Sequence, residues 1–169
     1  MRLMRVAERM RGQPHRPYNG QPECRKEKRV NANLEISRGA CHCGAVQFTV
    51  KLTDGLRSAR RCTCSYCRMR GAVAVSADLD GIDIVRGRDL LTVYQFNTNT
   101  AKHYFCARCG IYTHHQRRSN PRQFGINVAC LEGMSPFDFQ EIPVYDGTRH
   151  TADGYPLTRA GTLIFEPAE

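Results

Sequence analysis

Cysteines at metal-binding spacing dominate the chemistry that this chain could perform. Seven of its nine cysteines fall into three clusters: C-H-C-G at 41–44, C-T-C-S-Y-C at 62–67 and C-A-R-C-G at 106–110. Cysteines one or two residues apart can direct their sulfurs toward one point, and zinc takes four nitrogen or sulfur ligands in a tetrahedron. The count of four plus three predicts two Zn²⁺ ions per chain.

The first and third clusters together supply a complete ligand set. Cys41 and Cys43 with Cys106 and Cys109 offer four thiolates, the composition of a structural zinc site. A glycine follows each pair directly, and glycine tolerates the positive φ that lets backbone amides turn back toward the sulfurs. We therefore expect these two distant pairs to meet around one ion.

The middle cluster supplies only three ligands, Cys62, Cys64 and Cys67. Three protein ligands plus an open position is the pattern of a catalytic zinc. A closed structural site is the alternative, with a fourth ligand from Cys24, Cys130 or a histidine. Cys24 lies in a charged segment and Cys130 in an apolar run, which favours an incidental thiol and a buried core cysteine.

Two other uses of these cysteines fit the sequence less well. The odd count, the C-x-C spacing and the lack of a signal peptide argue against a disulfide framework. A redox role for C-A-R-C would need a βαβ context that the sequence does not show. Thiols reserved for metal need a reducing compartment, so we expect a cytoplasmic protein.

The elements that must position the clusters have the pattern of short strands. Residues 46–50 alternate between apolar and polar types, the period of a half-buried strand. Turn pairs such as Asp80-Gly81 and Asp146-Gly147 separate further runs. These runs span 72–77, 82–85, 91–96, 103–105, 125–129, 143–145 and 162–165. With one short helical turn expected after Cys64, the predicted fold class is mostly β.

Residues 1–36 differ from the rest of the chain in composition. They hold three prolines and a basic run, R-K-E-K-R, with little apolar periodicity. We predict a flexible basic amino-terminal extension over 1–36, followed by one domain over 37–169. No apolar run in the chain has the length of a membrane span.

The formal charge of +9 belongs mainly to the extension. Residues 1–38 carry ten Lys and Arg against four Asp and Glu, whereas residues 39–169 carry fifteen against twelve. Binding of two Zn²⁺ ions by seven ionised cysteines would add seven negative and four positive charges to residues 39–169. The resulting three negative charges would offset the excess of three positive charges in this part of the chain. A near-neutral domain argues against nucleic acid as a partner.

The three clusters and their flanks resemble the glutathione-dependent formaldehyde-activating enzyme family, whose domain also occurs in centromere protein V. The resemblance is carried by G-A-C-H-C-G-A-V-Q-F at 39–48, C-T-C-S-Y-C-R at 62–68, Y-F-C-A-R-C-G-I at 104–111 and I-N-V-A-C-L-E-G at 126–133. It implies a β-tent fold of stacked antiparallel sheets around a structural zinc, with few short helical turns. By position, the four paired cysteines would hold that ion and the middle three the catalytic ion.

The resemblance also implies a carbon-sulfur lyase-type activity. A small-molecule thiol such as glutathione would bind at the open zinc as a thiolate and add to an aldehyde such as formaldehyde. Protonation of the product needs a general acid, for which Tyr66, Tyr104 and His103 are the candidates. Two alternatives stay open: a non-catalytic glutathione or thiol carrier, and a zinc-stabilised interaction module.

Arginines bracket the middle cluster and favour an anionic ligand there. Arg60, Arg61, Arg68 and Arg70 lie within eleven residues. Glutathione carries two carboxylates, which arginine can bind in bidentate fashion. A solvated basic rim is the alternative for any single arginine. Asn127, inside an apolar run, is expected to hydrogen-bond in or near the same pocket, with a plain structural role as the alternative.

Overall fold

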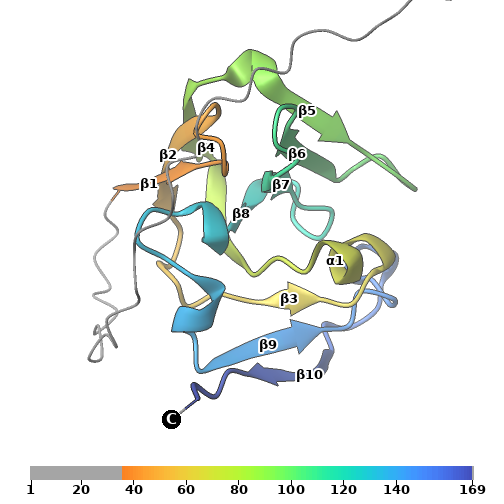
Figure 1. The fold of residues 1–169 in the computed structure, drawn as a ribbon. Coiled ribbons are helices and arrows are strands. Elements are labelled where there is room, and N and C mark those ends of the chain that lie inside the picture. The colour runs from red at the N-terminus through yellow and green to blue at the C-terminus, as the bar shows by residue number, and fades with distance from the viewer. Residues whose placement is uncertain (1–35, 169) are drawn as a thin grey trace, which may run out of the picture. The chain divides into compact units, whose positions relative to one another are not determined.

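The computed structural model describes residues 36–168. The extension expected over 1–36 and the thiol of Cys24 lie outside these residues, apart from Ile36 itself. The described part of the chain consists of two β-sheets connected by loops and short helices (Figure 1). This confirms the mostly β fold class that the sequence predicts.

The described residues form ten strands and five short helices. The strands are β1 (Ile36–Ala40), β2 (Gln47–Leu52), β3 (Arg61–Cys62), β4 (Ala74–Arg86), β5 (Leu91–Tyr94), β6 (Lys102–Cys106), β7 (Tyr112–Gln116), β8 (Gln123–Asn127), β9 (Glu141–Tyr145) and β10 (Arg159–Ile164). The helices are α1 (Ser65–Arg70) and the 3₁₀ turns η1 (Arg88–Leu90), η2 (Val128–Cys130), η3 (Pro136–Asp138) and η4 (Thr151–Asp153). The helical turn expected after Cys64 is therefore present as α1.

The strands are distributed over two sheets. Seven strands form an antiparallel sheet in the order β1-β2-β4-β8-β7-β6-β5. The second sheet has the order β10-β9-β3, in which β9 and β10 are antiparallel and the short β3 pairs with β9 in parallel. This parallel pair places the 62–67 cysteine cluster next to the end of β9.

The core lies on one face of the seven-stranded sheet. Phe48, Val50 and Leu52 alternate on β2 and are buried, as the period of the sequence predicts. They pack against Val75 on β4 and Ile126 on β8, both fully buried. A contiguous apolar core of this kind fixes the strand register, because a slip by one residue would expose the whole set.

Strand β4 differs from the sequence prediction. The runs at 72–77 and 82–85 belong to one strand of 13 residues, and Asp80-Gly81 is not a turn. Val50 on β2 pairs with Ile82 on β4, whereas Leu52 pairs with Ala77. Residues 78–81 of β4 therefore form a bulge-like irregularity opposite β2. A Cβ on Gly81 would lie 3.0 Å from the carbonyl oxygen of Lys51. The lack of a side chain at Gly81 therefore lets β4 approach β2 closely.

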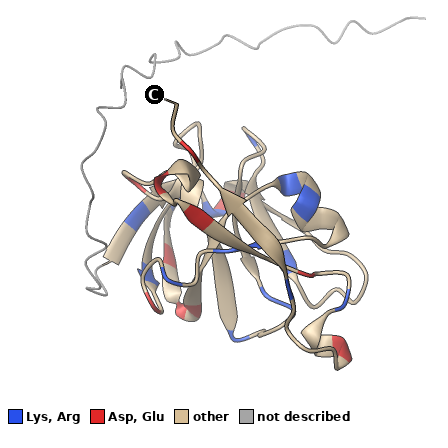
Figure 2. Ribbon diagram, turned by 90° about the horizontal axis from the view of Figure 1, so that it is seen from below, with Lys and Arg blue, Asp and Glu red and all other residues tan. Residues whose placement is uncertain are grey.

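The charges of the domain are mixed over its surface. Figure 2 shows Lys and Arg interspersed with Asp and Glu along the ribbon. Within residues 36–168, no helix combines the length and the apolar character that crossing a bilayer requires.

Candidate metal centres and the cavity beside them

The two paired cysteine clusters meet in space. The sulfurs of Cys41, Cys43, Cys106 and Cys109 lie within 4.8 Å of one another. The sulfur of Cys43 is 3.6 Å from that of Cys41 and 3.9 Å from that of Cys106. Zinc-sulfur bonds of about 2.3 Å in a tetrahedron place the sulfurs about 3.8 Å apart. The donor set and its spacing therefore fit a zinc ion.

Local backbone geometry directs these sulfurs inward. Gly44 and Gly110 have φ of 69° and 72°, as expected from their positions after each pair. The turn at Gly44 lets the amide of Val46 donate a hydrogen bond to the sulfur of Cys41 over 3.3 Å. Amides that point at a sulfur stabilise its thiolate form, which is the form that binds metal.

The four-cysteine cluster connects distant parts of the large sheet. Cys41 follows β1, Cys106 ends β6, and four strands separate β1 from β6 in the sheet. The sulfurs of Cys41 and Cys106 lie in a small apolar cluster with Ala45 and Val46, apart from the main core. Burial raises the pKa of both thiols. A metal ion that replaces their protons would fasten the two ends of the sheet together.

The three-cysteine cluster is built by β3 and the start of α1. The sulfurs of Cys62, Cys64 and Cys67 lie within 4.8 Å of one another, and no other described His, Cys, Asp or Glu joins them. Cys64 is the N-cap of α1, and its sulfur accepts a hydrogen bond from the amide of Cys67 over 3.4 Å. Cys130 is buried elsewhere, where its thiol donates to the carbonyl oxygen of Tyr112 over 3.4 Å. Cys130 is thus a core cysteine, as the sequence indicates.

The ionisation of the three thiols is strongly linked. Hydrogen bonds from Cys62 and then Cys67 lower the pKa of Cys64 to about 2. Hydrogen bonding to Cys62 and Cys64 raises the pKa of Cys67 far above its usual range. One thiolate therefore forms readily, whereas ionising all three requires a cation that offsets their mutual repulsion. This chemistry also fits zinc.

The backbone of Gly147 covers one side of this cluster. A Cβ at that position would lie 2.3 Å from the sulfur of Cys62 and 2.6 Å from the amide nitrogen of Cys64. The amide of Gly147 donates to the hydroxyl of Thr63 over 3.0 Å, and Thr63 in turn donates its amide to the carbonyl of Tyr145. The sequence indicates only a turn here, whereas the structure shows a close approach that any side chain would disrupt.

A cavity of about 740 Å³ opens beside the three cysteines. Its walls come from α1, from strands β3, β4, β6, β7 and β9, and from the segments that follow β2, α1, β5, β7 and β9. All three cysteines of the cluster line it, whereas none of the four-cysteine cluster does. The volume lies in the usual range of small-molecule sites, roughly 300–1,000 Å³.

The cavity is more strongly basic than the domain as a whole, in which residues 39–169 carry fifteen Lys and Arg against twelve Asp and Glu. Asp146 is the one acidic residue among its described lining residues. The lining contains six arginines: Arg57, Arg60, Arg61, Arg70, Arg117 and Arg118. Such a concentration of guanidinium groups attracts and orients an anionic ligand.

Three of the predicted ligand-binding residues line this cavity, namely Arg60, Arg61 and Arg70, and two do not. Arg68 lies on α1 outside the lining. Asn127 is buried, donates to the carbonyl oxygen of Tyr112 over 2.8 Å and accepts from the amide of Ala129 over 3.2 Å. In the structure the side chain of Asn127 therefore caps η2.

Arg117 and Arg118 have no spacing relation to the cysteines, and their position is set by the sheet. They follow β7, which places them at the cavity through its pairing with β8. Burial, and then the charge of Arg60, lower the pKa of Arg117 to about 10. No local signal in the sequence marks these two residues.

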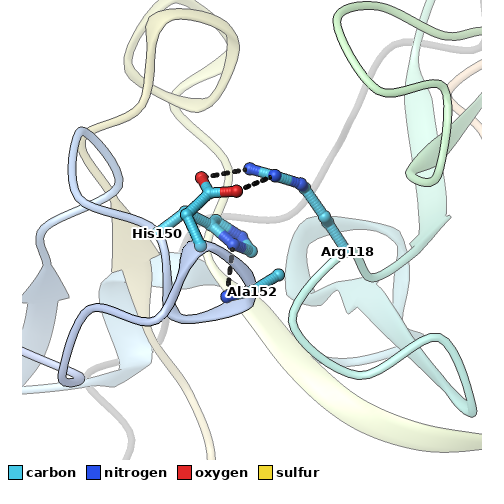
Figure 3. A network of polar contacts seen from close by, with 4 residues as sticks. Arg118, His150 and Ala152 are labelled. Carbon is cyan, nitrogen blue, oxygen red and sulfur yellow. Dashed lines mark hydrogen bonds and ion pairs between the residues drawn. The ribbon is translucent and has the colours of Figure 1, made fainter.

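Arg118 and η4 form one rim of the cavity. The guanidinium of Arg118 makes a two-pronged ion pair with Asp153 (Figure 3). His150 caps η4, because its Nδ1 accepts a hydrogen bond from the amide of Ala152 over 3.1 Å. The ion pair between Arg118 and Asp153 joins the segment after β7 to the segment after β9.

Arg70 connects the cysteine cluster to a histidine of the cavity wall. Its guanidinium is 3.4 Å from the sulfur of Cys67 and 3.1 Å from Nδ1 of His103, and it stacks 3.7 Å over the ring of Tyr112. Arginine has only donors, so Nδ1 of His103 accepts and the proton of this imidazole is on Nε2. Burial, and then Arg70, lower the pKa of His103 to about 4. His103 is therefore neutral at pH 7.

His103 is the one candidate general acid that lines the cavity. Its Nε2 is buried and has no hydrogen-bond partner within residues 36–168. The ring of Tyr66 packs 4.4 Å from that of His103, and the ring of Tyr104 stacks on His114 at 4.4 Å. Both tyrosines therefore have packing roles beside or behind the cavity wall.

The two-sheet fold and the two cysteine clusters define a small, mostly β domain in which each cluster could hold a metal ion. Residues 36–142 match the family described as glutathione-dependent formaldehyde-activating enzyme. This match extends over more than half of the chain and includes all seven clustered cysteines. The chain belongs to this family.

Two similar proteins were found by comparison of sequence and of structure. A relative from Halomonas elongata, provisionally named a glutathione-dependent formaldehyde-activating enzyme, is 35% identical over 83 residues, which cover 44% of this chain and 52% of the relative. The chain thus spans about half the length of that relative. A crystal structure of a Rhodobacter sphaeroides protein is 59% identical, with a TM-score of 0.62, and covers 63% of this chain and 98% of that one.

Proposed function

We propose that the chain is a zinc-dependent carbon-sulfur lyase-type enzyme that joins a thiol such as glutathione to an aldehyde such as formaldehyde. The sulfur would bond to the carbonyl carbon, the carbon-oxygen double bond would become single, and the oxygen would take up the proton that the thiol gives up, to give an S-hydroxymethyl product. The observation that carries the proposal is a three-cysteine cluster opening onto an arginine-lined cavity. Family membership supports glutathione and formaldehyde as the substrates.

The two cysteine clusters would hold two zinc ions with different tasks. Cys41, Cys43, Cys106 and Cys109 offer a closed set of ligands and a structural role, whereas Cys62, Cys64 and Cys67 leave one coordination position open. When bound there, zinc would keep the sulfur of the substrate thiol in its thiolate form at neutral pH. Free cysteines in both sets need a reducing compartment, for which we propose the cytoplasm.

The arginines of the cavity would bind the substrate and orient its sulfur. Glutathione has two carboxylates, and a guanidinium binds a carboxylate through two parallel hydrogen bonds. Anchoring at a distance from the reacting atom restricts the thiol to few orientations, which lowers the entropic barrier of the addition. The chain would thereby select anionic thiols over neutral ones.

His103 would supply the hydrogen bond that the product oxygen needs. Its neutral imidazole has the proton on Nε2, and this N–H has no acceptor within the described residues. An aldehyde oxygen that approaches it would satisfy the N–H while negative charge develops on that oxygen. Arg70 fixes the tautomer of His103 and also contacts the sulfur of Cys67, so it would align the two halves of the reaction.

Catalysis is tested by the rate of product formation. Full-length, zinc-loaded protein is mixed with glutathione and formaldehyde, and S-hydroxymethylglutathione is followed by NMR exchange spectroscopy against the uncatalysed addition. We expect a saturable acceleration that grows in proportion to protein concentration. Glutathione binding with an unchanged rate would identify the chain as a carrier and refute the enzyme proposal.

The His103→Phe variant should lower kcat about 100-fold, the magnitude typical of removing one hydrogen-bond donor to a developing oxyanion. Its dissociation constant for glutathione should change less than about twofold, because phenylalanine preserves the aromatic packing against Tyr66 and Phe96. Tyr104→Phe is the control, since Tyr104 does not line the cavity. Equal kcat values for His103→Phe and the unmodified chain would exclude His103 as the donor.

A further inference from the structure

Two arginines from distant segments meet on one wall of the cavity. Arg60 directly precedes β3 and Arg117 directly follows β7. Both guanidiniums donate to the hydroxyl oxygen of Ser76 on β4, over 3.4 Å and 2.9 Å. The side chain of Ser76 is buried, and Arg117 is 7% exposed. The two positive charges are thus fixed close together in a poorly hydrated position.

The negative charge of Asp54 acts on both guanidiniums, but its carboxylate accepts a hydrogen bond from the hydroxyl of Ser58 over 2.8 Å and forms an ion pair with neither arginine. No Asp or Glu oxygen within residues 36–168 forms an ion pair with Arg60 or Arg117. Arg60 also donates to the carbonyl oxygen of Ser58 over 2.7 Å, and Arg117 to Oε1 of Gln123 over 3.2 Å. A guanidinium has five N–H donors, so three on each arginine make no hydrogen bond within the described chain.

This arrangement is unfavourable without an anion. Buried charges in proteins are normally paired, because burial removes the hydration that stabilises them. Placing two like charges against one hydroxyl adds repulsion to that loss. Since both arginines line the cavity, an anion that enters it can accept their unused N–H groups and offset both effects.

The other arginines of the cavity are less suited to this role. Arg118 is neutralised by Asp153, and Arg70 is engaged by Cys67, His103 and the ring of Tyr112. Arg57 is exposed to solvent, where an ion pair contributes little. Arg61 forms no ion pair within residues 36–168 either, but its guanidinium shares no hydrogen-bond acceptor with a second arginine. A buried anion site in this cavity is therefore best formed by the Arg60 and Arg117 pair.

We propose that Arg60 and Arg117 form a subsite for a carboxylate of the ligand whose sulfur lies at the three-cysteine cluster. The inference rests on the proposed function and narrows its substrate class to thiols that carry a carboxylate. Two convergent guanidiniums match the two acceptor oxygens of a carboxylate, as a lysine could not. Arg117 is not among the ligand-binding residues predicted from the sequence. Arg60 is among them, and the subsite assigns it a carboxylate that it binds together with Arg117.

Isothermal titration of the zinc-loaded full chain tests the subsite with two ligands. Glutathione carries both carboxylates, and glutathione diethyl ester keeps the thiol while masking both. We expect Arg117→Gln and Arg60→Gln each to weaken glutathione about 30-fold, in the range for truncating one member of a buried charge pair. The diester should bind the variants and the unmodified chain with the same affinity. Arg122→Gln is the matched control, because Arg122 is exposed and does not line the cavity; it should change glutathione affinity less than about threefold.

The outcomes separate this inference from the proposed function. S-methylglutathione keeps both carboxylates but has no thiol, so its binding reports the subsite without the sulfur. Binding of S-methylglutathione that depends on Arg60 or Arg117 would support the subsite even if glutathione catalysis fails. Equal glutathione affinity in the two variants and the unmodified chain would overturn the subsite and leave thiol binding intact.

Thermal melting of each variant shows whether the substitution has changed its folding. Arg117 is the more buried of the two, so Arg60→Gln provides the test if Arg117→Gln does not fold. A variant that weakens glutathione and its diester equally would show a structural role for the arginine and overturn the inference. Failure of both glutathione and S-methylglutathione to bind the unmodified chain would overturn it as well.

Discussion

Replacement of Cys106 by serine should unfold the described domain. The sulfur of Cys106 lies within 4.8 Å of those of Cys41, Cys43 and Cys109. Cys106 is fully buried. Structural zinc contributes about 10 kcal/mol or more to the folding of small domains, whereas a whole domain is stable by about 5–15 kcal/mol. Losing one ligand from this set should therefore remove most of the net stability.

The reason lies in the position of the four-cysteine cluster. It fastens the loop after β1 to the loop after β6, and only a small apolar group that includes Ala45 and Val46 surrounds it. Such a small group cannot replace the metal as a source of folding energy. Without an ion, buried thiols would remain at this junction and the link between the loop after β1 and the loop after β6 would be lost.

Circular dichroism melting and elemental analysis provide the measurement. The unmodified chain should contain about two zinc ions and melt cooperatively, whereas Cys106→Ser should show no cooperative transition and a loss of bound zinc. Cys130→Ala is the control, because Cys130 is also buried but belongs to neither cluster; it should lower stability by about 1–2 kcal/mol. A Cys106→Ser protein that melts like the unmodified chain would show that this cluster is not structural.

Local patterns in the sequence were sufficient for the fold class and for grouping the cysteines. The alternation over 46–50 predicted a half-buried strand, which β2 confirms, and the C-x-C and C-x-x-C spacings placed sulfurs that can converge. Glycines that follow cysteine pairs predicted positive φ, which Gly44 and Gly110 show. In each case the signal is contained within a few residues, so no knowledge of the sheet order is needed.

Features that depend on pairing between distant strands could not be predicted from local sequence patterns. Asp80-Gly81 has the composition of a turn, and only the partner strand β2 makes it part of β4. Arg117 reaches the cavity because β7 pairs with β8 and β8 with β4, where Ser76 lies. For Asn127 the sequence left a pocket role and a structural role open, and only the structure shows that its side chain caps η2.

Replacement of Cys64 by serine should leave the fold intact and abolish thiol chemistry. Cys64 is the N-cap of α1, and its sulfur accepts a hydrogen bond from the amide of Cys67. Serine is among the preferred N-cap residues and can accept the same bond, so the melting temperature should stay close to that of the unmodified chain. The substitution removes one of three ligands at the open site, which should release about one zinc ion per chain.

The expected loss of activity follows from what the open site contributes. A metal ion that stabilises charge in a reaction is worth several kcal/mol, which corresponds to a rate factor on the order of 1,000. Cys64→Ser should therefore lower kcat/KM for glutathione and formaldehyde by about that factor. Glutathione affinity should fall toward that of S-methylglutathione, since the carboxylates would then provide the remaining contacts.

The comparison with Cys106→Ser decides whether the two clusters differ in kind. Elemental analysis, thermal melting and the exchange assay are applied to Cys64→Ser, and Ser65→Ala serves as the control because Ser65 lines the cavity beside the cluster without offering a thiolate. If Cys64→Ser and Cys106→Ser melt alike, both clusters are structural and the proposed enzyme has no open metal site. If Cys64→Ser stays folded and loses zinc but keeps its rate, the arginine-lined cavity works without a metal-bound sulfur.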